Sequence, residues 1–282
     1  MVTIRNLEFG YRKEHLFNGL DLDLNPGNIY GLLGRNGTGK TTLLKIITGQ
    51  LFSQGGSCDV LGYTPGERNP AMLEDVYFLP EEFHLPPVKG QRYMQAYAPF
   101  YPRFDRQAFL TQLEEFELPD DRNLNAMSYG QKKKFLLSFA MATGASLILL
   151  DEPTNGLDIP SKSQFRRLIT GRLREDQAIL ISTHQVRDME NMIDPVIILE
   201  NGKILLNRNI NEISSKVSMK MFRSLPEDDG VLYSEKVLGG YAAVVEEPSQ
   251  EFAMDLEILF NTVMQNKEKM AVLFGKEEQH HD

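Results

Sequence analysis

GRNGTGKTT, at residues 34–42, is the stretch that decides the fold. It fits the phosphate-binding pattern G-x-x-x-x-G-K-[ST], which is specific when it lies between a strand and a helix. Both flanks are present, because residues 29–33 form a short apolar run and residues 40–48 have a helical pattern. Glycines let successive backbone N–H groups point at phosphate oxygens, and the helix N-terminus adds partial positive charge. We therefore expect Lys40 to reach the outer phosphates of a nucleotide and Thr41 to suit Mg²⁺.

A second, apolar stretch ends in two acids. Residues 147–150 read Leu-Ile-Leu-Leu, and Asp151 and Glu152 follow them. A strand would carry these acids to its C-terminal end, beside the phosphate loop. We expect Asp151 to hold Mg²⁺ through water and Glu152 to polarise an attacking water. A strand that ends in acids is common, so the specificity comes from its pairing with the loop at 34–42.

The pattern of strands and helices around these motifs predicts the fold class. The strand patterns lie at residues 2–9, 20–24, 29–33, 147–150, 178–182 and 196–199, and the helix patterns at 40–48, 161–174 and 185–192. Strands that alternate with helices predict an α/β fold with a largely parallel sheet covered on both faces.

The middle of the chain, residues 83–145, is rich in aromatic residues and helix formers, and we expect it to be a helical insertion in the sheet domain. Asp105 is a good N-cap for a helix at 106–116. Ser128 is a good N-cap for a second helix that runs on through residue 142.

The composition changes near residue 210. Residues 211–282 hold 14 acidic and 7 basic residues, whereas residues 1–210 hold 25 and 23. This shift predicts a domain boundary, with the main domain at 1–210 and a C-terminal extension at 211–282. Within the extension, residues 241–245 have a strand pattern and residues 252–264 a helical one. His280 and His281 are given no role.

Composition excludes several classes of protein. The chain is 41% hydrophobic and 24% charged, which is typical of soluble globular proteins. No stretch approaches the ~20 apolar residues of a membrane span, and the N-terminus lacks the pattern of a secretory signal. A lone cysteine, Cys58, gives no disulfide framework, so we expect a cytoplasmic protein. The net charge of −9 argues against non-specific nucleic-acid binding.

Over about residues 2–210, the ordered motifs resemble those of the ATP-binding subunits of ABC transporters. DEPTNGLD at 151–158 resembles the Walker B segment and the D-loop of that family, and STH at 182–184 the segment with its switch histidine. MSYGQ at 127–131 resembles its signature sequence. The resemblance implies a P-loop NTPase core with a mixed, largely parallel sheet and an N-terminal antiparallel β piece. It also implies the helical insertion, beside which we expect a small α+β extension at the C-terminus.

The resemblance also implies ATP and Mg²⁺ as ligands and a role for each matching residue. Glu152 would be the general base, helped by His184 at the γ-phosphate, and Asp151, Glu81 and Thr41 would organise the metal. Tyr11 would stack on adenine, with Phe9 as the alternative. The nucleotide-binding set is Tyr11, Gly34, Asn36, Gly37, Thr38, Gly39, Lys40, Thr41, Thr42, Ser128, Gly130 and Asp158. Of these, Ser128 and Gly130 would close the site of a partner, and Asp158 would couple the two sites.

Two positions depart from the usual pattern of the family. Tyr129 replaces a glycine of the signature, although Ser128 and Gly130 are kept and the helix start can still bind a γ-phosphate. Glu81 stands where glutamine is usual. This variant resembles subunits that pair with ABC-2-type permeases, many of which are exporters. The lysines at 132–134 also resemble that subgroup, or they form a solvated helix start.

The resemblance implies partners. Two such domains, identical or different, would meet head to tail, and a separate permease would hold them at the inner face of the cell membrane. The aromatic run at 83–104 would line the docking groove for the permease or form the core of the insertion. The alternative is a soluble ABC-type ATPase that acts on ribosomes or DNA. Translation factors of that type usually carry two ATPase domains, and one phosphate loop is present here. Ser128 and His184 argue against a P-loop kinase or a GTPase.

Overall fold

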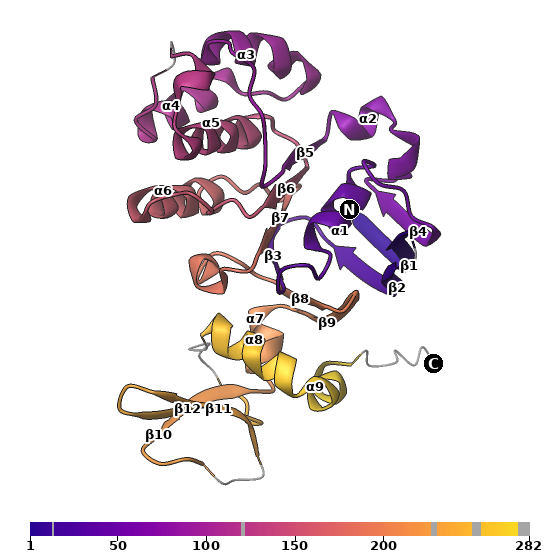
Figure 1. Cartoon of the computed structure of the whole chain (residues 1–282), viewed down its shortest axis with the longest axis vertical. Coiled ribbons are helices and arrows are strands. Elements are labelled where there is room, and N and C mark those ends of the chain that lie inside the picture. The colour runs from indigo at the N-terminus through magenta and orange to yellow at the C-terminus, as the bar shows by residue number, and fades with distance from the viewer. Residues whose placement is uncertain (13, 120–121, 227–229, 250–254, 276–282) are drawn as a thin grey trace.

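The computed structural model describes residues 1–12, 14–119, 122–226, 230–249 and 255–275. In Figure 1 the helices α3 to α5 lie at one end of the molecule, two sheets form its middle, and the segment after β9 forms the other end. The phosphate loop follows β3, in the middle part.

The largest sheet has six strands, and all are parallel except the last, which is antiparallel to its neighbour. In sheet order they are β5 (Val76–Leu79), β6 (Leu147–Asp151), β7 (Ala178–Thr183), β3 (Asn28–Leu33), β8 (Val196–Glu200) and β9 (Lys203–Arg208). The parallel strands β3, β6 and β7 end at the same edge of the sheet. The chain segments that follow them are therefore neighbours, although they lie far apart in sequence.

Two antiparallel sheets of three strands each flank this one. The N-terminal sheet has the order β2 (Glu14–Leu24), β1 (Val2–Tyr11) and β4 (Gly55–Val60). The sheet near the C-terminus has the order β10 (Ser218–Phe222), β12 (Gly240–Val245) and β11 (Val231–Val237). The mixed sheet and the N-terminal antiparallel piece confirm the predicted fold class.

The helices connect and cover these sheets. They are α1 (Lys40–Ile47), α2 (Pro70–Leu73), α3 (Gly90–Tyr97), α4 (Arg106–Glu115), α5 (Tyr129–Ala142), α6 (Ile159–Thr170), α7 (Ile210–Ser214), α8 (Leu256–Gln265) and α9 (Lys267–Phe274), with short 3-10 helices at Pro65–Glu67, Ala98–Phe100, Leu124–Ala126 and Val186–Met189. Among the described residues, none of them is both long and apolar enough to cross a bilayer.

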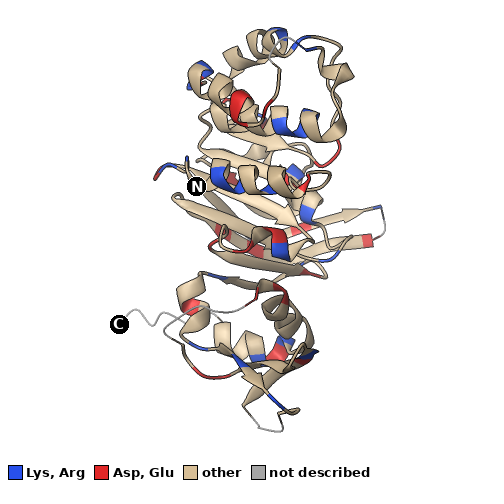
Figure 2. Ribbon diagram, turned by 90° about the vertical axis from the view of Figure 1, so that its left-hand side faces the viewer, with Lys and Arg blue, Asp and Glu red and all other residues tan. Residues whose placement is uncertain are grey.

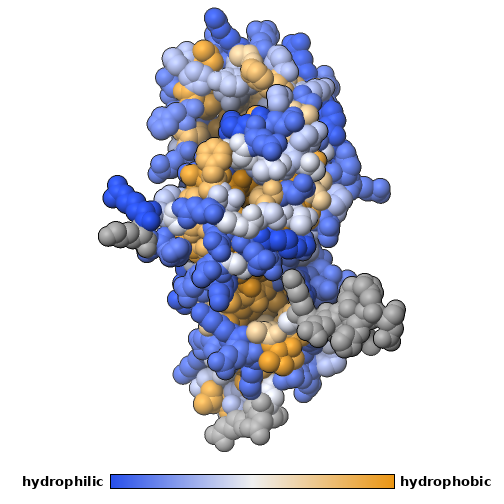
Figure 3. Space-filling model, turned by 90° about the vertical axis from the view of Figure 1, so that its right-hand side faces the viewer, coloured by the Kyte–Doolittle hydropathy of each residue, from blue (hydrophilic) through white to orange (hydrophobic). Residues whose placement is uncertain are grey.

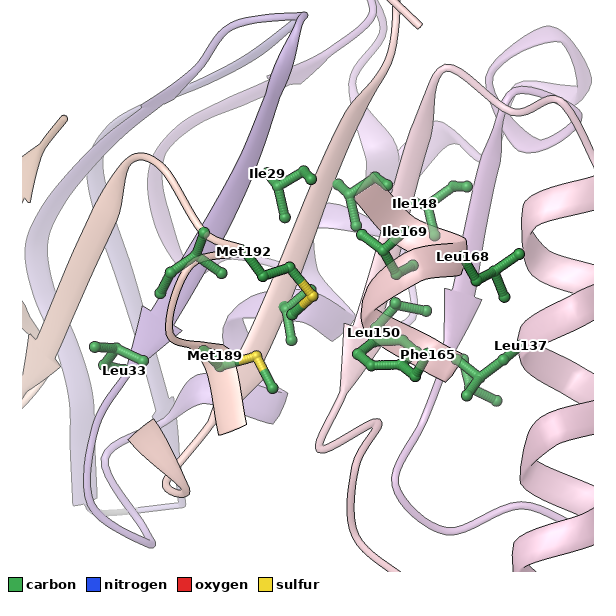
Figure 4. Close-up of a cluster of buried hydrophobic side chains, with 14 of the residues drawn as sticks. Ile29, Leu33, Leu137, Ile148, Leu150, Phe165, Leu168, Ile169, Met189 and Met192 are labelled. Carbon is green, nitrogen blue, oxygen red and sulfur yellow. The ribbon is translucent and has the colours of Figure 1, made fainter. Parts of the chain in front are cut away.

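Both faces of the five parallel strands are buried, which explains why these strands read as continuous apolar runs. In β6, Ile148 and Leu150 belong to the cluster on the α5 and α6 side, whereas Leu147 and Leu149 face α1. Figure 4 shows the first cluster, in which Phe165 of α6 lies among the side chains of the sheet. This packing holds the strand ends that carry the site.

Three expected helices differ in extent from the prediction. The helix predicted at 185–192 is only the 3-10 helix Val186–Met189, because Asn191 has a φ of 59°, which a helix does not tolerate. Asp158 accepts a hydrogen bond from the Ser161 N–H, so α6 starts before residue 161, and it ends at Thr170 rather than at the predicted residue 174. The helix predicted at 252–264 is α8, and residues 252–254 lie outside the described residues.

The surface seen in the figures is mixed. Acidic and basic residues are interspersed over the face shown in Figure 2. On the face shown in Figure 3, apolar side chains gather in small patches separated by polar ones. The face in Figure 2 is therefore not the broad basic face that non-specific nucleic-acid binding needs.

Candidate functional site

The phosphate loop joins β3 to α1 with the backbone geometry that its glycines allow. Gly39 has a φ of 103°, and a Cβ atom there would lie 2.9 Å from the Phe17 ring. The Lys40 ammonium donates to the backbone oxygens of Gly34 at 2.7 Å and Arg35 at 3.1 Å. Burial lowers the pKa of Lys40, and the nearby carboxylates of Glu152 and Asp151 oppose that shift.

Oxygen atoms that suit Mg²⁺ gather beside the loop. The Thr41 hydroxyl donates to Asp151 Oδ2 at 2.6 Å, and Ser182 Oγ donates to the other oxygen of the same carboxylate. Asp151 is buried, and Glu81 lines the same cavity. Hydroxyl and carboxylate oxygens are the donors that Mg²⁺ prefers, and a few of them suffice because the ion keeps water and phosphate ligands. The residues present therefore fit the metal.

Glu152 follows Asp151 with a φ of 46°. This unusual backbone conformation turns its side chain toward the switch loop, which holds Thr183 and His184. Its Oε2 accepts from the Thr183 hydroxyl at 3.0 Å, and its Oε1 accepts from the His184 N–H at 2.9 Å. The Nδ1 atom of His184 lies 2.7 Å from the same Oε1. The carboxylate is buried and lies 3.9 Å from the Lys40 ammonium.

A cavity of about 490 Å³ joins these groups. Its lining holds most of the predicted residues, namely Tyr11, Asn36, Gly37, Gly39, Lys40, Thr41, Thr42, Glu81, Asp151 and Glu152, together with Glu14, His15 and Leu16. Thr38 lies outside this lining and donates to the Arg35 oxygen at 3.0 Å. Carboxylates outnumber Lys40 here, so a phosphate ligand would need a cation and backbone N–H groups to offset its charge.

Tyr11 and Phe9 are placed differently at the rim of the cavity. Tyr11 is 52% exposed, and its hydroxyl lies 3.2 Å from Thr42 Oγ1. Phe9 is buried, and the Tyr11 ring meets it edge-on with ring centroids 5.0 Å apart. Of the two rings, only Tyr11 offers an accessible face.

The signature residues lie at the start of α5, outside the cavity lining. Ser128 caps this helix, and Ser128 and Gln131 form a capping box. Tyr129 is the first residue of α5. Its hydroxyl donates to the backbone oxygen of Glu81 at 2.8 Å, and its ring stacks on Phe83. A helical position accepts tyrosine as readily as glycine, so this departure does not distort the backbone. Gly130 lies close to the D-loop, because a Cβ atom there would come within 2.9 Å of the Gly156 oxygen.

His184 and Gly34 line a second cavity of about 270 Å³ beside the phosphate loop. Its remaining lining residues are Arg35, Asn36, Val186 and Phe260. Phe260 comes from α8, so the C-terminal part of the chain reaches the switch loop.

Comparison with known proteins gives the family. The family described as ABC transporter matches residues 17–155. An uncharacterised ABC transporter ATP-binding protein, YdbJ of Bacillus subtilis (strain 168), is 30% identical over 209 residues, which cover 72% of this chain and 68% of YdbJ. The chain belongs to the ATP-binding subunits of ABC transporters. It is therefore an ATPase, and its ligands are ATP and Mg²⁺.

Two further members of this ABC family are informative. The SkfA peptide export ATP-binding protein SkfE of Bacillus subtilis (strain 168) is 29% identical over 211 residues, which cover 73% of this chain and 87% of SkfE. A solved structure of an ATP-binding subunit of an ABC transporter has a TM-score of 0.69 at 23% identity, and the match covers 76% of this chain and 91% of that one. The second likeness supports the fold.

Sequence reasoning missed several residues of this ABC site. Lys133 belongs to the lysine run that we weighed as a solvated helix start, yet it is fully buried. Its ammonium donates to the backbone oxygens of Glu152 at 2.5 Å and Asn155 at 3.1 Å, and burial lowers its pKa to about 8. The motif at 182–184 predicted a role for His184 and none for Thr183, and Phe260 lies in a segment without any motif. Helical periodicity could have suggested Lys133, because Leu137 follows it by four residues and is buried.

Proposed function

We propose that this chain is the hydrolysing subunit of a membrane exporter, and that it works as a head-to-tail pair with a second ATP-binding subunit. A separate permease, of the ABC-2 type, would hold the pair at the inner face of the cell membrane. The ATP-binding part would be residues 1–210, with the extension at 211–282. The likeness to SkfE, whose name describes peptide export, supports the exporter assignment.

The observation that carries the pairing is that the signature residues lie outside the cavity that the phosphate loop lines. Lys40, Asp151 and Glu152 line the phosphate cavity, whereas Ser128 and Gly130 lie at the start of α5, outside it. A helix N-terminus attracts phosphate. A second subunit in the reverse orientation would bring its own Ser128 and Gly130 to the γ-phosphate, while Asp158 would lie between the two sites.

Within the phosphate cavity each remaining residue has a proposed task. The loop residues Gly34 to Thr42, which include Lys40, would hold the phosphates. Thr41, Asp151 and Glu81 would hold the metal, which offsets phosphate charge when bound. Glu152 would take a proton from the attacking water at its carboxylate. The N–H and ring of His184 would keep that carboxylate oriented.

Removing the Tyr11 ring tests the adenine platform. Base–aromatic stacking is worth ~1–3 kcal/mol per base. We expect Tyr11→Ala to weaken ATP binding by roughly tenfold, whereas Tyr11→Phe keeps most of the affinity because it keeps the ring. Calorimetric titration with ATP measures both. Equal affinities for Tyr11→Ala and the unaltered chain would remove Tyr11 from the site.

A groove away from the phosphate cavity supports the permease assignment. It measures about 530 Å³ and lies between the α2 region and the end of the 3-10 helix Ala98–Phe100. Leu73, Phe78 and Phe100 supply apolar lining, and Phe100 is 67% exposed. The aromatic run is thus divided, because Tyr93 and Phe104 pack against the core while Phe100 remains open to a partner.

Placing a charge in this groove tests the docking proposal. We expect Phe100→Asp to abolish capture of a polytopic membrane protein by the tagged chain from detergent-solubilised membranes of its own cells. A charge in an apolar contact leaves an unpaired buried ion. Basal ATP hydrolysis should stay the same, because Phe100 lies outside the phosphate cavity. Capture of ribosomal proteins or DNA in place of a membrane protein would favour the alternative function.

A further inference from the structure

We propose that Asn155 is a positioning residue that orients the Glu81 carboxylate through a one-way chain of side-chain hydrogen bonds. The chain runs from Glu81 through Asn155 and Gln185 to Lys162. This inference rests on the proposed role of Glu81 at the metal.

Of the three hydrogen bonds in this series, the two that involve Asn155 are short and the one from Lys162 is longer. The Asn155 Nδ2 donates to Glu81 Oε1 at 2.8 Å, and the Gln185 Nε2 donates to Asn155 Oδ1 at 2.8 Å. Lys162 Nζ lies 3.4 Å from Gln185 Oε1 and donates to Asp188 Oδ2 at 2.6 Å. All four members of the chain are half-buried, so water competes only in part for these bonds.

The chemistry of the two ends fixes the direction of the chain. An ionised Glu81 only accepts hydrogen bonds, so Asn155 must turn its NH₂ group toward it. The Asn155 carbonyl then faces Gln185, which must offer its own NH₂ group. At the other end Lys162 only donates, and it requires the Gln185 carbonyl. Both ends therefore demand the same orientation of the two amides between them.

The series of hydrogen bonds from Glu81 to Lys162 connects three loops of the site. Glu81 lines the phosphate cavity, Asn155 follows the Walker B acids, and Gln185 is the neighbour of His184. The backbones are anchored as well, because Tyr129 donates to the Glu81 oxygen and Lys133 donates to the Asn155 oxygen. Removing the Asn155 amide or reversing its orientation would therefore displace Glu81 relative to the switch loop.

Exchanging the donor and the acceptor tests this inference. Asn155→Asp places two acceptor-only carboxylates face to face, and we expect a loss of kcat of about tenfold or more in the full chain. Glu81→Gln restores a donor, because the amide that it introduces can donate to the new carboxylate at position 155. In the Glu81→Gln background, Asn155→Asp should therefore lower kcat by no more than about threefold. Both comparisons are made at saturating ATP.

Asn155→Ala is the matched control. It removes the amide without adding charge, so its cost should be similar in the two backgrounds. If Asn155→Asp is equally harmful with Glu81 intact and in the Glu81→Gln background, the residue acts only as packing and the inference is wrong. If Asn155→Asp folds only together with Glu81→Gln, as melting curves would show, the coupling is confirmed.

A second exchange covers the case in which Asn155→Asp folds in neither background. Gln185→Glu puts an acceptor-only group against the Asn155 carbonyl. The Asn155 amide must then turn over, so that its NH₂ group faces residue 185 and its carbonyl oxygen faces Glu81. Glu81→Gln should relieve this variant too, and a failure to relieve it overturns the inference. These outcomes are separate from the general base assignment, which the Glu152→Gln variant tests with Glu81 and Asn155 intact.

Discussion

Glu152→Gln is expected to lower the turnover of ATP by about 10²- to 10⁴-fold, the range that a positioned general base contributes. The glutamine oxygen can still accept from the His184 N–H or from Thr183, so the backbone and the cavity should keep their shape. The amide does not accept a proton from water. ATP binding should survive, because Lys40 and the phosphate loop are untouched.

Phosphate release measures turnover, and calorimetric titration measures binding. Glu200→Gln is a matched control, because Glu200 is also a buried glutamate at the end of a parallel strand but lies outside the cavity lining. It should hydrolyse ATP at the normal rate. Normal hydrolysis by Glu152→Gln itself would show that another group takes the proton.

Lys40→Ala is expected to weaken ATP binding by about 10- to 150-fold, which corresponds to the ~1.5–3 kcal/mol of a hydrogen bond to a charged group. The Lys40 ammonium now lies against the backbone oxygens of Gly34 and Arg35, at the mouth of the loop. It is also the ammonium beside the Glu152 carboxylate. Its loss would leave several carboxylates facing the phosphates without that cation.

Lys45→Ala serves as the control for this variant. Lys45 lies in the last turn of the same helix and outside the cavity lining, so its removal should leave ATP affinity unchanged. Calorimetry with ATP and Mg²⁺ compares the two. Equal affinities for Lys40→Ala and Lys45→Ala would contradict the phosphate role of Lys40.

The parts of the site that follow from local sequence were predictable. The loop at 34–42 needs only glycines and a following helix, and Asp151 needs only an apolar strand before it. The parallel order of β6, β7 and β3 then brings the two together, because parallel strands end at one edge.

The remaining contacts depend on side chains that meet across the fold. Lys133 stands between two other lysines, and its charge alone predicts an exposed side chain. Instead, its ammonium donates to the backbone oxygens of Glu152 and Asn155, which follow the Walker B strand. Asn155 meets Glu81 only because the chain after β5 and the chain after β6 lie side by side. Phe260 reaches the switch loop from α8, which no motif marks. Such pairings are set by packing, and a single sequence carries no direct signal for them.

The most direct measurement is the molar mass of Glu152→Gln by light scattering, with and without ATP and Mg²⁺. The signature residues Ser128 and Gly130 lie outside the lining of the phosphate cavity, so in our proposal a second subunit completes the site. We expect a monomer without nucleotide and a dimer with it. A monomer that binds ATP and keeps its mass would contradict the proposal that two copies of this chain complete each other's site.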